Sequence, residues 1–110
     1  MRWYSLRQRR RLLARRLRET DELVEDAVLL DVTARLAKKL LEFARDYGMA
    51  RPEGTVIGLR LTRADVASVV GATRESVNKP MGLFRGQEVL EMQHGRIVIR
   101  RPEELERRIY

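Results

Sequence analysis

The segment LTRADVASVVGATRESVNKPMGLF, residues 61–84, has the pattern of two short helices joined by a tight turn. Thr62 can cap the first helix, and Asp65 three residues later completes a pair that resembles a capping box. Gly71 can end this helix, and Thr73 can cap the next one at once. The apolar residues expected to be buried are Val66, Ala67, Val69, Val70 and Val77. This spacing, with small residues where the two helices cross, predicts a helix-turn-helix.

Pro80 lies inside the second of these helices. A proline there removes the hydrogen bond to the carbonyl of Ser76 and its ring clashes with that carbonyl, at a cost of about 3 kcal/mol. It also disfavours helical backbone angles at Lys79, the preceding residue. Because small domains have only ~5 to 15 kcal/mol of stability, this loss is serious without being fatal. We expect a kinked or shortened helix that still folds.

Short elements are expected on both sides of the helix-turn-helix. Upstream, Asp31 can cap a helix that stops before Gly48, followed by the polar connection MARPEGT and a strand over residues 55–61. Downstream, two short runs joined by QHG indicate a hairpin in which Gly95 can take a positive φ. Pro102 then starts a last short helix. The expected fold is mainly α with a small β-hairpin wing, a winged helix-turn-helix over residues 31–110.

Residues 1–30 are expected to form a separate long helix that pairs with another helix. Its apolar residues follow a seven-residue repeat, with Arg10 and Thr20 at the two weak positions. The predicted dimerisation residues are Leu6, Leu13, Leu17, Val24 and Ala27. Charge changes sign along the segment, from an arginine cluster to acidic residues, so it is not a uniform basic tail. An exposed basic helix whose leucines pack locally is the alternative.

The amino-acid composition and net charge limit the classes of function that the chain can have. The chain has 110 residues, with 23 Lys and Arg against 16 Asp and Glu and a net charge of +7, which favours a polyanionic partner such as nucleic acid or an acidic membrane surface. There is no cysteine, and His94 is the only histidine. Nothing assembles a nucleophile, a base and an orienting group, so we expect no enzyme, cofactor or metal site. No apolar run is long enough to span a membrane, so a cytoplasmic protein is expected.

Three segments together resemble the cyclic-AMP receptor protein and fumarate/nitrate regulator (Crp/Fnr) family. They are DVTARLAKKLLEFA, LTRADVASVVGATRESVNK and VLEMQHGRIVI, similar to that family's first helix after the dimer helix, its helix-turn-helix and its wing. The resemblance covers roughly residues 5–108, and the family's N-terminal effector-binding β-roll has no counterpart in this sequence. It implies a DNA-binding transcription regulator.

The resemblance also implies DNA contacts. Arg74, Glu75 and Lys79 are expected to face base edges in the major groove. Arginine and lysine can donate hydrogen bonds to guanine, and a glutamate carboxylate can accept one from cytosine. The residues implied to contact the DNA backbone are Thr62, Thr73, Ser76, Asn78 and Arg96. The sequence departs from the family at Lys79, where arginine is common, and at Glu88, where a glycine usually ends the helix. Gly86 is expected to end it about two residues earlier.

Three functions remain open at this point. The first is a sequence-specific regulator that binds double-stranded DNA as a homodimer on a two-fold site, with RNA polymerase as a further partner. The second is a truncated family member that pairs with a related full-length regulator and blocks it. The third is nonspecific binding of nucleic acid by a basic domain.

Overall fold

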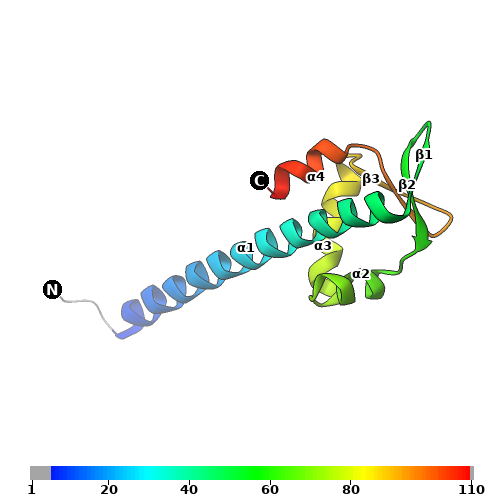
Figure 1. Ribbon diagram of the computed structural model, residues 1–110. Coiled ribbons are helices and arrows are strands. Elements are labelled where there is room, and N and C mark those ends of the chain that lie inside the picture. Colours follow the sequence, from blue (N-terminus) through cyan, green and yellow to red (C-terminus); the bar gives the residue numbers. More distant parts are fainter. Residues whose placement is uncertain (1–5, 110) are drawn as a thin grey trace.

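The computed structural model describes the backbone of residues 6–109 and the side chains of residues 27–109. It contains four helices and four strands within that range (Figure 1). In chain order these are α1 (Leu6–Tyr47), β1 (Gly48–Arg51), β2 (Gly54–Arg60), α2 (Arg63–Val70), α3 (Arg74–Gly86), β3 (Leu90–Gln93), β4 (Arg96–Ile99) and α4 (Pro102–Ile109). The mainly helical winged helix-turn-helix expected from the sequence is therefore confirmed.

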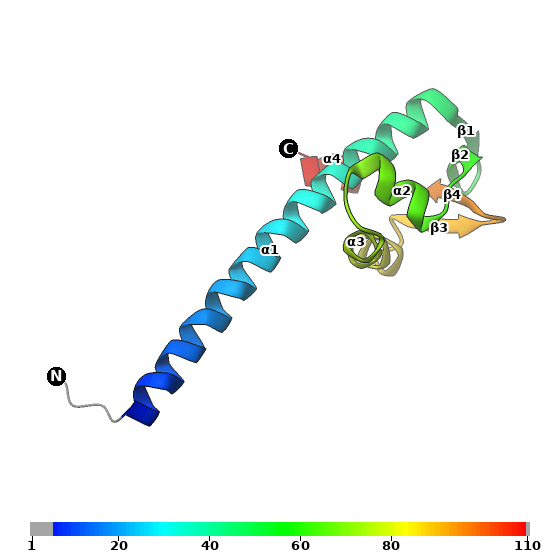
Figure 2. The same cartoon turned by 90° about the horizontal axis from the view of Figure 1, so that it is seen from below.

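The helix α1 is a single element of 42 residues, and its N-terminal part projects away from the rest of the chain (Figures 1 and 2). The expectation that Asp31 caps a second helix is wrong. Residues 6–47 contain neither glycine nor proline, so nothing in the backbone stops the helix at that point. Asp31 lies inside α1, where its carboxylate pairs with the Arg35 guanidinium at 3.0 Å.

The C-terminal part of α1 packs against every other helix. Val32, Leu36 and Leu40 are buried on its inner face, and α4 lies against it with Leu105 buried. The one buried polar residue of the described side chains, Thr33, donates its hydroxyl to the carbonyl of Leu29 at 2.6 Å. This bond satisfies the hydroxyl, so Thr33 adds no unpaired polar group to the core.

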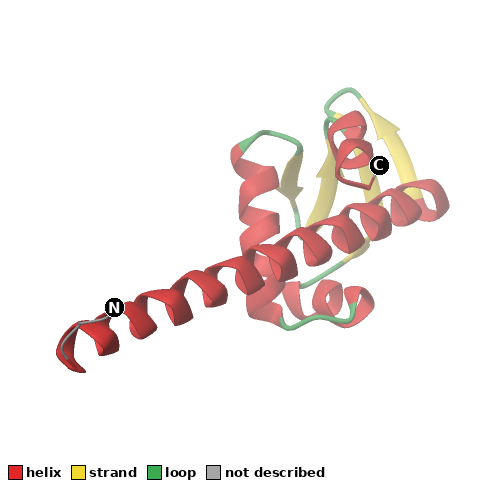
Figure 3. Cartoon of the chain, turned by 90° about the vertical axis from the view of Figure 1, so that its left-hand side faces the viewer, coloured by secondary structure: helices red, strands yellow, loops and turns green. Residues whose placement is uncertain are grey.

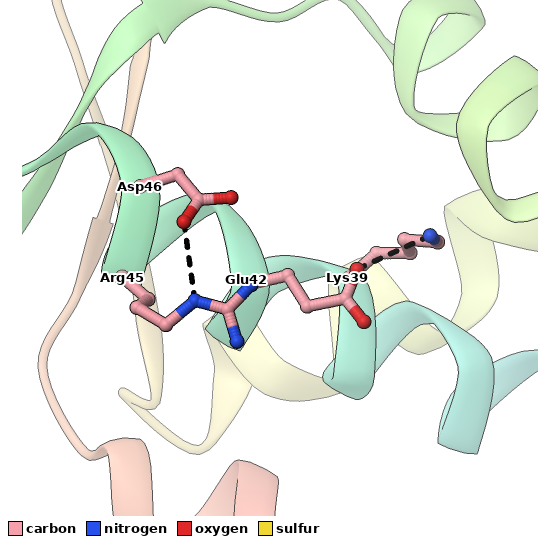
Figure 4. Close-up of polar contacts among 4 residues, drawn as sticks. All are labelled: Lys39, Glu42, Arg45 and Asp46. Atoms are coloured by element: carbon pink, nitrogen blue, oxygen red, sulfur yellow. Dashed lines mark hydrogen bonds and ion pairs between the residues drawn. The ribbon is translucent and has the colours of Figure 1, made fainter.

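The last turns of α1 also carry charged side chains that pair along the helix surface (Figure 4). Lys39 donates to Glu42 at 3.1 Å, and Arg45 donates to Asp46 at 3.1 Å. The hydrogen bond from Arg45 to Asp46 raises the pKa of that arginine above its ordinary value. Pairs this exposed contribute little to stability, so the burial of the apolar face is what holds α1 on the domain.

The four strands form one antiparallel sheet in the order β1-β2-β4-β3, beside the C-terminal part of α1 (Figure 3). The sequence interpretation missed β1, because MARPEGT was expected to be a polar connection only. The chain turns from α1 into β1 at Gly48, where a Cβ atom would overlap the carbonyl oxygen of Ala44. Glycine is therefore required at this reversal, and residues 48–51 pair with residues 54–57 of β2.

The wing is the β3–β4 hairpin expected from the sequence. His94 and Gly95 form its two-residue turn with φ of 52° and 77°, which is the left-handed pair of a type I′ turn. Gly95 therefore takes the positive φ that was expected. Along β4, Ile97, Val98 and Ile99 are buried. The wing is thus fixed to the core along β4, and its turn points outward.

The helix-turn-helix has the expected caps. Thr62 and Asp65 form a complete capping box at the start of α2, and Gly71 ends this helix with a left-handed φ of 77°. Thr73 caps α3 by accepting a hydrogen bond from the Ser76 amide at 3.0 Å. One expected core residue is wrong: Val69 is 42% exposed, because α2 buries only the positions on one side of its two turns.

The helix α3 packs one face into the core. Val77, Pro80, Met81 and Phe84 are buried, at spacings of three and four residues. The helix continues through Pro80 to Gly86. The expectation that Gly86 moves the end of the helix about two residues earlier is wrong, because the left-handed residue that ends it is Glu88, at the position of the family's usual glycine. Pro80 thus keeps the apolar packing of its position while it removes one hydrogen bond to the carbonyl of Ser76.

Pro80→Val should raise the free energy of unfolding by about 1 to 3 kcal/mol, because valine restores an N–H that can donate to the Ser76 carbonyl and remains apolar. Urea denaturation followed by circular dichroism measures the change. Pro80→Ala is the matched control, since it restores the same N–H with a smaller buried side chain. An unchanged or lower stability in both variants would show that the surrounding structure compensates for the missing bond.

The end of α3 contains a second departure from ideal geometry. Glu88 has a φ of 60°, a left-handed conformation that costs a side-chain-bearing residue about 1 kcal/mol. The amide of Val89 donates to the carbonyl of Phe84 at 2.8 Å, and the amide of Glu88 donates to that of Arg85 at 3.1 Å. These two bonds form a Schellman motif, for which glycine is the usual residue at the position of Glu88.

Glu88→Gly should therefore stabilise the fold by about 1 kcal/mol, because glycine takes the left-handed angle without a steric cost. The lost ion pair to Arg101, at 3.8 Å and on the surface, contributes little. Thermal unfolding measures the effect, with Gln87→Gly as control at a neighbouring residue with φ of −88°. A lower melting temperature for Glu88→Gly would contradict this account of the turn.

Candidate nucleic-acid interface

The face of α3 opposite its buried side is exposed and carries polar side chains. Arg74 and Asn78 are four residues apart, as are Glu75 and Lys79, so the four side chains lie together on this face. All four are exposed. The three residues predicted to read base edges are thus brought together, two cations and one carboxylate within the first two turns of the helix.

The hydroxyl groups predicted to contact the DNA backbone serve first as caps. Thr73 and Ser76 hydrogen-bond to each other through their hydroxyls at 2.7 Å. At the start of α2, the Thr62 amide donates to Asp65 at 3.0 Å and the Asp65 amide donates to the Thr62 hydroxyl at 3.1 Å. The backbone hydrogen bond from Thr62 holds the pKa of Asp65 below its ordinary value. These bonds orient both helix N-termini, whose free N–H groups suit an anion.

The wing contributes Arg96, the last of the predicted backbone-contacting residues. Its position in β4 is opposite Arg60 at the end of β2, so two cations lie side by side on neighbouring strands. The Nε atom of Arg96 is buried and has no hydrogen-bond partner in the described part of the chain. A cavity of about 400 Å³ between the wing and the start of α2 is lined by Arg60, Arg63, Met92 and Gly95, among others.

Two arginines that sequence reasoning missed join separate elements. Arg35 of α1 donates to the carbonyl of Val70 at 3.0 Å, at the C-terminal end of α2. Arg63, the first residue of α2, donates to the side-chain oxygen of Asn78 on α3 at 2.9 Å. The partners are 35 and 15 residues apart in the sequence, so no local spacing signals either bond.

Of the five predicted dimerisation residues, only Ala27 has a side chain within the described residues. Leu6, Leu13, Leu17 and Val24 lie within α1, but their side chains are outside the described residues. Ala27 is exposed, and the side chains of Val28 and Leu30 next to it are 51% and 65% exposed. The projecting part of α1 therefore presents apolar side chains to solvent where it leaves the domain.

The described residues contain neither a membrane-spanning helix nor a cluster of metal-binding side chains. No helix among residues 6–109 is long and apolar enough to cross a membrane. Among residues 27–109, whose side chains are described, no three His, Asp or Glu side chains come together in a group that could hold a metal ion. The polar face of α3 and the arginines beside it are the feature that needs a functional explanation.

Comparison with known proteins gives the family. Residues 34–108 match the model of the Crp-like helix-turn-helix domain. The chain is 36% identical over 98 residues to the CRP-like cAMP-activated global transcriptional regulator of Mycobacterium tuberculosis, covering 89% of this chain and 44% of that protein. It is 30% identical over 90 residues to the global nitrogen regulator of Synechococcus elongatus, covering 82% of this chain and 40% of that protein.

Solved structures show the same fold. The catabolite activator protein of Thermus thermophilus superposes with a TM-score of 0.72 at 24% identity, over 94% of this chain and 45% of that one. The CO-dependent transcription factor CooA of Carboxydothermus hydrogenoformans superposes with a TM-score of 0.71 at 23% identity, over 94% and 48%. The chain spans less than half the length of each of these four proteins. It belongs to the Crp-like helix-turn-helix domain family.

Proposed function

We propose that this protein is a transcription regulator that binds double-stranded DNA in a sequence-specific manner, with α3 in the major groove. The observation that carries the proposal is the exposed face of α3, where Arg74, Glu75 and Lys79 lie away from the buried face. These side chains offer donors and one acceptor to base edges. Family membership supports the same function, because similar proteins of Mycobacterium tuberculosis and Salmonella typhimurium are named global transcriptional regulators.

The residues around α3 are suited to hold the DNA backbone on either side of the groove. Thr62 and Thr73 mark two helix N-termini, whose N–H groups and partial positive charge favour a phosphate. Arg96 on the wing and its neighbour Arg60 add positive charge on the side of β4. Such contacts give affinity without sequence preference, whereas Arg74, Glu75 and Lys79 would provide the specificity.

We further propose that the chain acts as a homodimer through α1 and binds a two-fold site. The support is the exposed apolar surface at Ala27, Val28 and Leu30, on a helix that projects beyond the domain it belongs to. The apolar seven-residue repeat lies in the N-terminal part of the same helix, at Leu6, Leu13, Leu17 and Val24. A symmetric pair of such helices would place two copies of α3 on the two halves of one site.

The same exposed helix supports the second candidate function. A chain that pairs through α1 could also pair with a related full-length regulator and block it, since a similar helix surface would be available in such a relative. Formation of that mixed dimer in the absence of DNA, with a loss of the relative's DNA binding, would favour this function over the first.

Arg74→Ala should weaken binding to a selected duplex by about 1 to 3 kcal/mol and relax the preference at one base pair, because the guanidinium can donate two hydrogen bonds to guanine. Fluorescence anisotropy on the selected duplex and on a random duplex, each over a range of salt concentrations, measures both effects. Arg45→Ala, which removes an exposed arginine of α1 away from α3, is the matched control. Equal losses on the two duplexes would show that Arg74 only contacts phosphate.

A further inference from the structure

One hydrogen bond connects the start of α2 directly to the exposed face of α3. The guanidinium of Arg63 donates from a terminal nitrogen to the side-chain oxygen of Asn78 at 2.9 Å. Arg63 follows the capping residue Thr62, and the capping box there holds the backbone in place. Asn78 is exposed and lies one turn beyond Arg74 on the same face. Arg63, at the capped start of α2, therefore holds the side chain of Asn78 on α3.

The chemistry of the two groups determines which way the Asn78 amide points. A guanidinium has hydrogen-bond donors and no acceptor, so only the amide oxygen of Asn78 can face it. The amide nitrogen, with its two donors, is then directed away from Arg63. A free asparagine offers both a donor and an acceptor and suits adenine, which needs both. Asn78 held by Arg63 offers its nitrogen, and its oxygen is already engaged.

We propose that Arg63 is a positioning residue that makes Asn78 a hydrogen-bond donor toward DNA, an inference that rests on the proposed function. Asn78 so held selects an acceptor atom, such as a phosphate oxygen or an acceptor on a base edge. Together with Arg74 and Lys79, it makes three donors on the face of α3, beside the single acceptor Glu75. The acceptor for a cytosine or adenine amino group is then Glu75 and not Asn78.

The test is a double-mutant cycle of DNA binding with Arg63→Met, Asn78→Ala and the double variant. Methionine keeps an unbranched side chain at position 63 and removes every donor. Arg45→Met is the matched control, because it removes one exposed arginine of α1 to which no contact with DNA is assigned. Dissociation constants are measured on the selected duplex and on a random duplex, at a temperature where circular dichroism shows all variants folded.

The expected result is a loss that is not additive. Asn78→Ala should weaken binding about tenfold. Arg63→Met should weaken binding by a similar factor in the parental protein. In the Asn78→Ala background, Arg63→Met should weaken binding no more than Arg45→Met does. A loss confined to the selected duplex would assign the acceptor to a base edge, and a loss on both duplexes would assign it to a phosphate.

Three results would overturn the proposal. Additive losses within a factor of two would show that Arg63 acts independently of Asn78. Coupling in the melting temperature without coupling in the dissociation constants would show that the bond only braces the two helices. Failure of the parental protein to prefer any sequence would overturn the proposed function, and this inference with it, whereas the first two results leave that function intact.

Discussion

The burial of one face of α3 is the constraint on which the rest of the structure depends. Val77, Pro80, Met81 and Phe84 are packed into a core that draws on every helix and on three of the four strands. Once that face is buried, the rotation of α3 about its own axis is fixed, and the opposite face with Arg74, Glu75 and Lys79 must meet solvent or a partner. The kind of partner that fits this exposed face then depends on the elements around α3, which are α2, the wing and the end of α1.

Two residues in or beside α3, Pro80 and Glu88, lower the local stability of the backbone. Pro80 removes a backbone hydrogen bond while it keeps the core filled, and Glu88 takes a left-handed angle that suits glycine. Both lie after the first turn of the helix, which holds Arg74 and Glu75. Arg74 and Glu75 can therefore keep their geometry, while the part of the helix from Lys79 onward and the turn into β3 carry the cost.

The sequence was sufficient for the elements with strong local signals. Capping residues, glycine at the left-handed end of α2 and the hairpin turn at His94 and Gly95 each depend on neighbours within a few residues. The continuous α1 depends on the absence of a break, and the bonds from Arg35 and Arg63 join residues far apart in the sequence. The strand β1 pairs with its neighbour β2, but all four of its residues are exposed, so no alternation of apolar residues signals it. A capping residue such as Asp31 signals a helix start only where the preceding chain is not already helical, which local spacing cannot show.

The polar face of α3 was predicted residue by residue, but the orientation of its side chains was not. Arg74, Glu75, Lys79 and Asn78 are exposed on that face, whereas the engagement of Asn78 by Arg63 follows from how α2 and α3 cross. Their contacts with DNA stay predictions. In the same way the repeat from Leu6 to Val24 predicts helix pairing, and only a partner helix can test it.

The most direct test of the account is selection of binding sites from random double-stranded DNA, with the mass of the protein–DNA complex measured on the same sample. The account predicts an enriched sequence with two-fold symmetry, whose half-sites lie about one helical turn of DNA or a multiple of it apart, bound by two copies of the chain. An enriched pool without symmetry, bound by one copy, would contradict the homodimer. No enrichment at all would contradict the reading of DNA sequence by α3.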